Sequence, residues 1–417
     1  MQEKLLAGID FGTSNSLLSV ATKIKEIKPV PIYNDKAVIP TTLFFWENGS
    51  FYGEKAVQSY LKGEEGRFMR GIKSLLNSQT EREGTRIFGR FYSFKNIIKT
   101  FLNHLKTEAE ARLDAPIEDV VLGRPVHFCD NEKEDKAAEE CLKKIALELG
   151  FKNVSFQYEP VAAAFSHEQE IQKEELALIA DLGGGTSDFS VIRLVPNALK
   201  KQDRSQDILS NDSVHLAGTD LDRDTAYTLL MPHFGKNSLR KNGLAIPYVY
   251  FNDVCEWHKI QSLYTPNMQE NCLQLLQDLS NKELFQRYVS MIQKELGHYM
   301  LFETEKAKIE LSSSPKATLN FTPIEKDFMI FLSKEEFLSA TLKTRDKIIQ
   351  KAKETILNAG IAPKKINSLI FTGGTSLVPS LSKGIKDLCP NAVVQNISTY
   401  ASVGNGLAIE AYRRYGK

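Results

Sequence analysis

The sequence lacks the features of a disulfide-stabilised, membrane-spanning or nucleic-acid-binding protein. Its five cysteines are scattered, odd in number and free of C-x-x-C spacing, which predicts reduced thiols in a cytoplasmic protein. No apolar run approaches the ~18 residues of a membrane span, and the start "MQEKLLAGID" does not fit a signal peptide. Lys and Arg total 53 against 52 for Asp and Glu, so the bulk charge favours neither nucleic acid nor a membrane surface as a partner.

Two glycine-rich blocks also lack the common nucleotide-binding motifs. They read "AGIDFGTSNSLLSV" at 7–20 and "LIADLGGGTSDFSVI" at 178–192, and neither contains G-x-G-x-x-G or G-x-x-x-x-G-K-[ST]. In each block an apolar run ends at an aspartate, a glycine turn follows, and a second apolar run begins. The pattern predicts two β-hairpins of the same kind, whereas Rossmann and Walker glycines lead into a helix.

The duplicated turn has the chemistry of an anion site. Glycine lets backbone N–H groups approach a phosphate, and neighbouring hydroxyls add donors. Two such hairpins facing each other would hold a polyphosphate, with Asp10 and Asp181 binding Mg²⁺ largely through water. The alternative is a plain hairpin turn with a capping aspartate. That alternative suits one block alone, but two blocks in the same strand-turn-strand context favour the site.

The rest of the chain alternates strands and helices over a length that suggests two or more domains. Apolar spacing predicts helices at 94–114, 133–149, 281–311 and 333–359, and an Ala-rich helix beginning at "YEPVAAAF". We expect a surface hairpin or loop at 199–212. The segment 235–280 matches no motif, and we expect its aromatics to fill a small helical core. Cys255 and His258 alone do not make a metal site.

Five segments, in order, resemble the DnaK-type heat-shock protein 70 family, whose ATPase domain belongs with actin and the sugar kinases. "GIDFGTSNS" and "LIADLGGGTSDFSV" resemble its two phosphate motifs, "SLIFTGGTSLVPSL" its adenosine motif, and "VVLGRPVHF" and "EPVAAAF" its connecting segments. The likeness covers nearly the whole chain. It implies an α/β protein with the actin-like ATPase fold, in which two duplicated ribonuclease H-like lobes flank a nucleotide cleft. Lobe I is expected at 1–174 with an inserted subdomain at about 41–113, and lobe II at 175–417 with a helical insert at about 219–334 and a last helix returning toward lobe I.

The resemblance also implies roles for single residues. It implies that Asp10 and Asp181 hold Mg²⁺, that Lys73 neutralises the γ-phosphate, that Glu159 orients the attacking water, and that Asp188 lies near that water. The residues expected to contact ATP or ADP are Gly12, Thr13, Ser14, Asn15, Gly183, Gly184, Gly185, Thr186, Gly218, Glu305, Lys308, Ser312, Gly373, Gly374 and Thr375, with Thr186 also counted in the catalytic set. Without this context, Lys73 would be interpreted as a surface lysine and Glu159 as a helix-start acid.

The sequence departs from the family pattern in two respects. Ile309 and Leu377 stand where the family stacks adenine between arginines, and Tyr400 stands where it has an aspartate. Each lost cation–π contact removes about 0.5–2 kcal/mol of binding, so modest nucleotide affinity is expected. No apolar linker and peptide-binding β-domain follow the last predicted helix. The chain therefore resembles the short branch sometimes called YegD-like, and peptide clamping is not expected.

These observations predict a slowly hydrolysing, chaperone-like Mg-ATPase. Three alternatives stay open: an actin-like filament protein, a small-molecule kinase, and a nucleotide sensor that binds without hydrolysis. The expected ligands are ATP or ADP with Mg²⁺. A client protein or co-chaperone is a further partner that the sequence does not identify, and neither nucleic acid nor a membrane is expected.

Overall fold

The computed structural model describes residues 4–23, 26–77, 79–196, 198, 204–396 and 398–416. The chain forms two compact units. Unit 1 comprises 1–217, 348–376 and 381–417, and unit 2 comprises 218–347 and 377–380. The lobe boundaries expected from the sequence stay a prediction.

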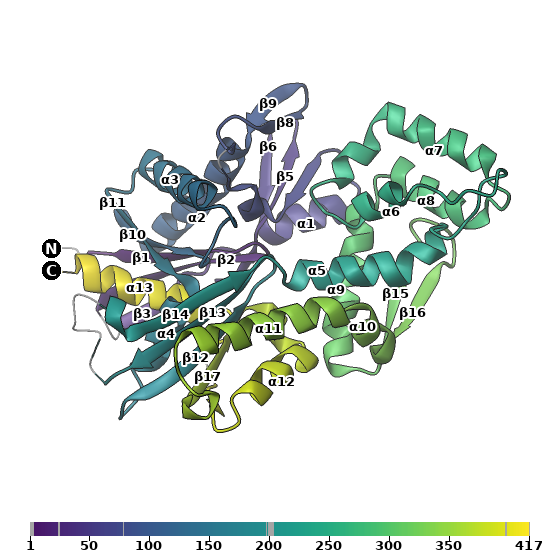
Figure 1. Cartoon of the computed structure of the whole chain (residues 1–417). Helices are drawn as coiled ribbons and strands as arrows, with labels where there is room; N and C mark the ends of the chain where they lie inside the picture. The colour runs from purple at the N-terminus through teal and green to yellow at the C-terminus, as the bar shows by residue number, and fades with distance from the viewer. Residues whose placement is uncertain are drawn as a thin grey trace. The chain divides into compact units, whose positions relative to one another are not determined.

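Unit 1 contains two sheets of the same topology (Figure 1). Within the described residues the first sheet has the order β11-β10-β1-β2-β3, and the second has the order β18-β17-β12-β13-β14. In each sheet the first three strands along the chain are antiparallel neighbours, and the two later strands add in parallel. The strands are β1 (Leu6–Phe11), β2 (Asn15–Lys23), β3 (Glu26–Pro29), β10 (Asp119–Arg124), β11 (Asn153–Tyr158), β12 (Glu175–Leu182), β13 (Ser187–Leu194), β14 (Ile208–Val214), β17 (Ser368–Thr372) and β18 (Val393–Val394), and the short β4 (Ile39–Pro40) pairs with β2. The predicted mixed α/β fold with duplicated sheets is confirmed.

Both predicted glycine hairpins are present. The β1–β2 pair is antiparallel and pairs Phe11 with Ser16, and the β12–β13 pair is antiparallel and pairs Leu182 with Ser187. The strands are apolar on both faces because the sheets are covered on both sides. Each buried strand therefore ends where the chain turns polar, and the Asp-Gly residues lie at that end.

The helices of unit 1 cover the sheets. They are α1 (Gly53–Leu61), α2 (Phe94–Leu113), α3 (Glu132–Glu148), α4 (Glu159–Glu168), α11 (Leu342–Asn358, from 348 on), α12 (Pro379–Leu388, from 381 on) and α13 (Ser402–Tyr415). One apolar core packs α2 and α3 against the first sheet. A second core joins α4 and α13 with residues of both sheets, including Val121, Ile179 and Leu407. The last helix thus packs on β1, β2 and β10, as Figure 1 also shows.

Short strands complete unit 1 between β4 and α2. They form a three-stranded sheet of β5 (Thr42–Trp46), β6 (Gly49–Tyr52) and β7 (Arg67–Arg70), and a hairpin of β8 (Gly84–Ile87) and β9 (Arg90–Ser93). After β7, Gly71 adopts a left-handed conformation with φ 62° and starts a 3₁₀ turn, Ile72–Leu75. This turn carries Lys73.

Unit 2 is mainly helical. Its elements are α5 (Gly218–Thr225), a π turn (Ala226–Leu230), α6 (Tyr248–Val254), α7 (Pro266–Asp278), α8 (Glu283–Gln293), α9 (Gly297–Ser313), β15 (Lys316–Asn320), β16 (Met329–Ser333), α10 (Lys334–Ala340) and the start of α11. Its core contains buried Phe251, Phe285 and Tyr288, whose rings pack at centroid distances of 5.2 to 6.2 Å. The expectation that the aromatics of 235–280 fill a helical core is confirmed for Phe251, whereas Tyr248 of the same segment is exposed.

Two expected long helices are each interrupted. The first is split into α8 and α9 by residues 294–296, and Glu295 has a φ of 54°, which an α-helix does not allow. The second is split at Thr341 between α10 and α11, although the predicted capping box of Ser333 and Glu336 is present. In the 199–212 segment, residues 208–212 belong to β14, which pairs antiparallel with β13, so the hairpin alternative fits there; residues 199–203 lie outside the described residues.

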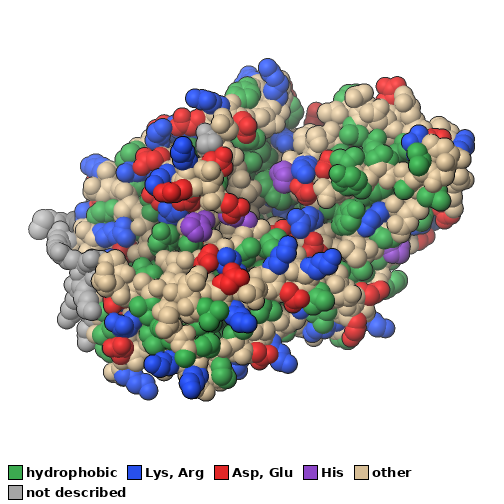
Figure 2. Space-filling model, viewed as in Figure 1, with side chains coloured by type: hydrophobic (Ala, Val, Ile, Leu, Met, Phe, Trp, Pro, Cys, Tyr) green, Lys and Arg blue, Asp and Glu red, His purple; other side chains and the backbone are tan. Residues whose placement is uncertain are grey.

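The surface agrees with the composition. Acidic and basic side chains are interspersed over the face seen in Figure 2. Apolar side chains gather there over α6, and the exposed large apolar residues of that stretch include Leu244, Tyr248 and Val249. Among the described residues, no helix is both long enough and apolar enough to span a membrane. All five cysteines are unpaired, as predicted.

Candidate functional site

The two glycine turns of unit 1 lie directly against each other. A Cβ atom at Gly184 would lie 2.1 Å from the Ser14 hydroxyl oxygen, and one at Gly185 would lie 2.8 Å from the Thr13 hydroxyl oxygen. A side chain at either glycine would displace these hydroxyl groups. The structure therefore brings together the two turns that the sequence predicts to face each other.

Each turn is held by hydrogen bonds to its own sheet or to a neighbouring segment. The Thr41 hydroxyl donates to the Gly12 carbonyl at 2.8 Å, and the Thr41 amide donates to the Ser14 carbonyl at 2.8 Å. In the second turn the Gly183 amide donates to the Thr186 carbonyl at 3.0 Å. The amides and hydroxyls of 12–15 and 183–186 are thereby grouped on partly exposed backbone, which suits an anion site.

Four carboxylates lie close together beside the turns. Burial, followed by the charges of Glu159, Asp188 and Asp10, raises the pKa of Asp181 well above its usual value. Burial and the charge of Glu159 raise the pKa of Asp10 to about 7, and the same two causes raise the pKa of Asp188 to about 7. Four acidic groups thus share a site that contains one lysine, and the excess of negative charge disfavours their simultaneous ionisation.

That lysine is Lys73, and it pairs with Glu159. The Lys73 Nζ donates to Glu159 Oε1 at 2.6 Å, and both side chains are 8% exposed. Burial opposes protonation of Lys73, but the charges of Glu159, Asp10 and Asp188 outweigh it and raise the pKa of Lys73. Lys73 is therefore not a surface lysine, which was the interpretation expected without the family resemblance. Gly123 provides the space for the pair, because a Cβ there would lie 3.1 Å from Glu159 Cγ.

Asp188 is held from the opposite sheet. Its Oδ1 accepts a hydrogen bond of 2.7 Å from the amide of Val126, which follows β10 of the first sheet. Asp188 is 1% exposed, and the Thr186 side chain also hydrogen bonds to it. A backbone donor from one sheet therefore fixes a carboxylate on the other.

The predicted adenosine motif lies beside the second turn in unit 1. Gly373 has a φ of 76°, its amide donates to the Thr399 carbonyl at 3.0 Å, and a Cβ there would lie 3.0 Å from Asp181 Oδ1. The Thr375 hydroxyl donates to the Gly183 carbonyl at 2.6 Å. Gly374 lies beside Tyr400, whose hydroxyl would be 3.1 Å from a Cβ at that glycine. The motif thus packs against the second turn and Asp181.

The remaining predicted nucleotide contacts lie in unit 2. Lys308 Nζ donates to the Gly218 carbonyl at 3.2 Å and to Asp222 Oδ2 at 2.8 Å, and the Ser312 hydroxyl donates to the Lys308 carbonyl at 3.0 Å. Glu305 lies one turn before Lys308 on α9. Ile309 and Leu377, which stand at the positions of the family's arginines, are 64% and 54% exposed. Large apolar side chains exposed to this degree are available to contact a ligand.

The donor set of unit 1 fits a hard divalent cation. Asp10 and Asp181 supply carboxylate oxygens; burial, followed by the charge of neighbouring carboxylates, raises the pKa of each, and a bound cation would favour the ionised forms. No group of three or more His, Cys, Asp or Glu with metal-binding geometry occurs in the described part of the chain. Two carboxylates suit Mg²⁺, which keeps several waters and takes substrate phosphates as ligands, and do not suit zinc.

Several contacts of the site were not predicted from the sequence. Thr41 holds the first turn through Gly12, and Gly123 leaves space for Glu159. In unit 2, Asp222 forms an ion pair with Lys308. Thr41 is 29 residues from Gly12 along the chain, so no local pattern signals the contact. Asp222 had a usable signal, because it lies four residues after Gly218 at the spacing of one helix face. The hydrogen bond from the Val126 amide to Asp188 comes from the backbone, so no residue type in the sequence signals it.

Duplicated sheets whose matching hairpin turns meet beside buried carboxylates define the class of the actin-like ATPase fold. The family model described as "Hsp70 protein" matches residues 6–244 and 289–416, and leaves 245–288 of unit 2 unmatched. The chain therefore belongs to the Hsp70 family.

Curated relatives are similar at low identity. The chain is 24% identical over 414 residues to the chaperone protein DnaK of Thermotoga petrophila, 23% over 418 residues to that of Thermosipho africanus, and 24% over 421 residues to that of Mycoplasma mycoides subsp. mycoides SC. Each match covers 98% of this chain and 59% of the relative. The chain thus spans about three-fifths of the length of the curated relatives it matches.

Proposed function

We propose that the chain binds Mg-ATP and hydrolyses it slowly as a chaperone-like ATPase. The observation that carries the proposal is the contact between the two Asp-Gly hairpins, which groups backbone amides, hydroxyls and carboxylates at one place. Family membership supports the nucleotide as the anion. The four carboxylates support a metal-bound polyphosphate over a bare phosphate, because a bare anion would be repelled by them.

The residues of unit 1 have separate roles in this proposal. The amides and hydroxyls of 12–15 and 183–186 bind phosphate oxygens, and Asp10 and Asp181 would hold Mg²⁺, which neutralises phosphate charge when bound. Lys73 supplies a fixed positive charge, and Glu159, already held by Lys73 at 2.6 Å, accepts a hydrogen bond from the attacking water. Phosphoryl transfer needs charge neutralisation and in-line positioning more than covalent help, so this small set is sufficient.

The resemblance to the family suggests nucleoside contacts in each unit taken by itself: the Gly373–Thr375 turn in unit 1, and residues of α9 in unit 2. Lys308, Glu305 and Ser312 lie on one face of α9, which suits hydrogen bonds to a ribose. Ile309 and Leu377 offer aliphatic surface to a base in place of guanidinium groups. We infer that base binding depends on apolar burial, so affinity is modest and selectivity among purines is low.

The test is calorimetric titration with Mg-ATP followed by single-turnover hydrolysis for wild type and Lys73→Ala. We expect both proteins to bind and the variant to lose hydrolysis by about 10²- to 10³-fold, the usual effect of removing one charge-stabilising group. Lys95→Ala is the matched control, because Lys95 pairs with Glu148 away from the site. Equal turnover in wild type and Lys73→Ala rejects the role of Lys73. Binding without hydrolysis in wild type supports the nucleotide sensor instead.

A further inference from the structure

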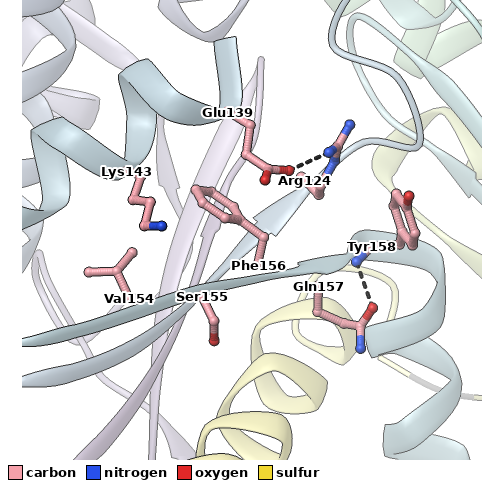
Figure 3. A pocket seen from close by; sticks show the side chains of 8 residues that line it. All are labelled: Arg124, Glu139, Lys143, Val154, Ser155, Phe156, Gln157 and Tyr158. Atoms are coloured by element: carbon pink, nitrogen blue, oxygen red, sulfur yellow. Dashed lines mark hydrogen bonds and ion pairs between the residues drawn. The ribbon is translucent and has the colours of Figure 1, made fainter. Parts of the chain in front are cut away.

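The side chain of Arg124 forms an unusually complete set of hydrogen bonds at the end of β10. Its Nη2 donates to both carboxylate oxygens of Asp135 at 2.9 and 2.7 Å, and its Nη1 donates to Glu139. Figure 3 shows Arg124 and Glu139 paired at the side of a cavity of about 480 Å³ along β11. Asp135 and Glu139 belong to α3, so the guanidinium joins the end of a strand to the following helix.

The same guanidinium holds the backbone that follows it. Its Nε donates to the Pro125 carbonyl at 3.1 Å, and its Nη2 donates to the Val126 carbonyl at 3.2 Å. Asp135 fixes the other end, because its Oδ1 accepts a hydrogen bond of 2.6 Å from the Phe128 amide. Residues 125–128, hereafter the strap, are therefore tied at both ends to one ion pair.

The middle of the strap contacts the site. Between its two tied ends, the Val126 amide donates to Asp188 Oδ1 at 2.7 Å. Asp188 is almost completely buried on β13 and interacts with Lys73 and Glu159. The strap is thus a hydrogen-bonded link between the largely buried Arg124–Asp135 ion pair and a carboxylate of the phosphate site.

We propose that Arg124 is a positioning residue that acts through the Val126 amide on Asp188. The inference rests on the proposed function, since Asp188 has a task only if the site carries out hydrolysis. A guanidinium is suited to this position because its planar fork donates to a carboxylate and to two carbonyls at once. A lysine at 124 has a single terminal nitrogen and cannot reproduce the set.

The first experiment does not depend on activity. Amide hydrogen exchange is measured on the nucleotide-free full chain for wild type, Arg124→Met and Arg413→Met. Arg413 is a matched control, because its side chain is 10% exposed against 12% for Arg124 and it also pairs with a buried carboxylate. We expect exchange at Val126 and Phe128 to become at least about tenfold faster in Arg124→Met and to stay unchanged in Arg413→Met. Unchanged protection of Val126 in Arg124→Met overturns the inference.

The second experiment separates positioning from a general loss of structure. At saturating Mg-ATP, Arg124→Met is expected to lower the single-turnover rate by about 10- to 100-fold, the usual effect of losing an outer-shell partner. The Kd for Mg-ATP is expected to stay within about twofold of wild type, because the hydrogen-bond partners of Arg124 are Pro125, Val126, Asp135 and Glu139, which are outside the predicted phosphate contacts. Arg124→Lys is expected to restore only a small part of the rate.

A double-mutant cycle completes the test. If Arg124 acts through Asp188, adding Arg124→Met to Asp188→Ala lowers the rate by less than about twofold, since the contact is already lost. Multiplying losses in the double variant overturn the inference and indicate a separate structural role. If wild type hydrolyses no ATP, the proposed function fails, and the exchange experiment still decides whether Arg124 holds the Val126 amide.

Discussion

Glu410 is a completely buried carboxylate outside the site, and its partners are well defined. It is 0% exposed in α13, and its carboxylate accepts hydrogen bonds of 2.7 and 2.6 Å from Arg413 and Arg414. Burial opposes its ionisation, but the two arginines outweigh this effect and hold the pKa of Glu410 below its usual value. The ionised pair therefore stabilises α13 at neutral pH.

The lowered pKa of Glu410 predicts that its contribution to the free energy of unfolding depends on pH and is absent in Glu410→Gln. The contribution of a carboxylate with a depressed pKa is fully present above its unfolded value of about 4.3 and is lost as the pH falls through the lower folded value. We expect Glu410→Gln to be less stable by about 3 kcal/mol at pH 7, with a difference that shrinks below about pH 4. Urea unfolding at several pH values measures this. A difference that does not change with pH would contradict the assignment.

Single site residues were predictable only where they are close in sequence or match a motif. The turns at 12–15 and 183–186 can be identified from adjacent residues, because strand, aspartate and glycines follow one another. Lys73 and Glu159 are 86 residues apart, and only the family resemblance relates them. The Val126 amide could not be predicted, since a backbone donor has no residue type and its place depends on Arg124 and Asp135.

Among the elements, α13 depends on glycine for its close packing in unit 1. A Cβ at Gly406 would lie 1.7 Å from the Ala162 carbonyl oxygen of α4, and a Cβ at Gly8 of β1 would lie 2.3 Å from the Ala408 nitrogen of α13. The neighbouring atoms are backbone and cannot rotate away. The last helix is thus packed backbone to backbone on the first strand and on the helix that begins with Glu159.

Gly406→Ala is therefore expected to destabilise the protein although alanine favours helices. Overpacking of a filled interior costs about 1–3 kcal/mol, which exceeds the ~1 kcal/mol that alanine adds to a helix. Gly384→Ala in α12 is the control, because its Cβ would meet the flexible end of Ile349 at 2.4 Å. Thermal unfolding should show a lower Tm for Gly406→Ala and little change or a rise for Gly384→Ala. Equal Tm values for the two variants would contradict the packing argument.

Element types were mostly predictable, and helix interruptions were not. Amphipathic spacing identified α2 and α3 correctly, because each has one long apolar face on the first sheet. The same spacing continues across 294–296, where the chain turns through Glu295 with a positive φ that glutamate rarely adopts. The segment 199–212 was interpreted as a hairpin or loop because it has little periodicity. Its last residues belong to β14, an edge strand paired on one side, which tolerates polar residues.

Across the whole chain, the matching topology of the two sheets explains why the site carries excess negative charge. In each copy of the strand-turn-strand block an aspartate stands near the end of the first strand, and packing the copies together brings both carboxylates, with Asp188 and Glu159, near Lys73. The arrangement is unfavourable in the free protein and favourable with a cation and phosphates present. Stability and ligand binding are therefore opposed at this site.

Asp181→Asn tests that opposition in one measurement. The raised pKa of Asp181 indicates that its charge is disfavoured in the folded state, so the neutral amide is expected to raise the Tm of the nucleotide-free protein at pH 8. The same change removes a predicted Mg²⁺ ligand and should abolish the stabilisation by Mg-ATP. In wild type, Mg-ATP at 100 times its Kd contributes about 2.7 kcal/mol, which corresponds to a rise in Tm of about 3–6 °C. Wild type with ATP and EDTA is the control and should show a much smaller rise. A variant that is less stable without nucleotide and still gains the full rise with Mg-ATP would contradict both the electrostatic account and the assignment of Asp181 to the cation.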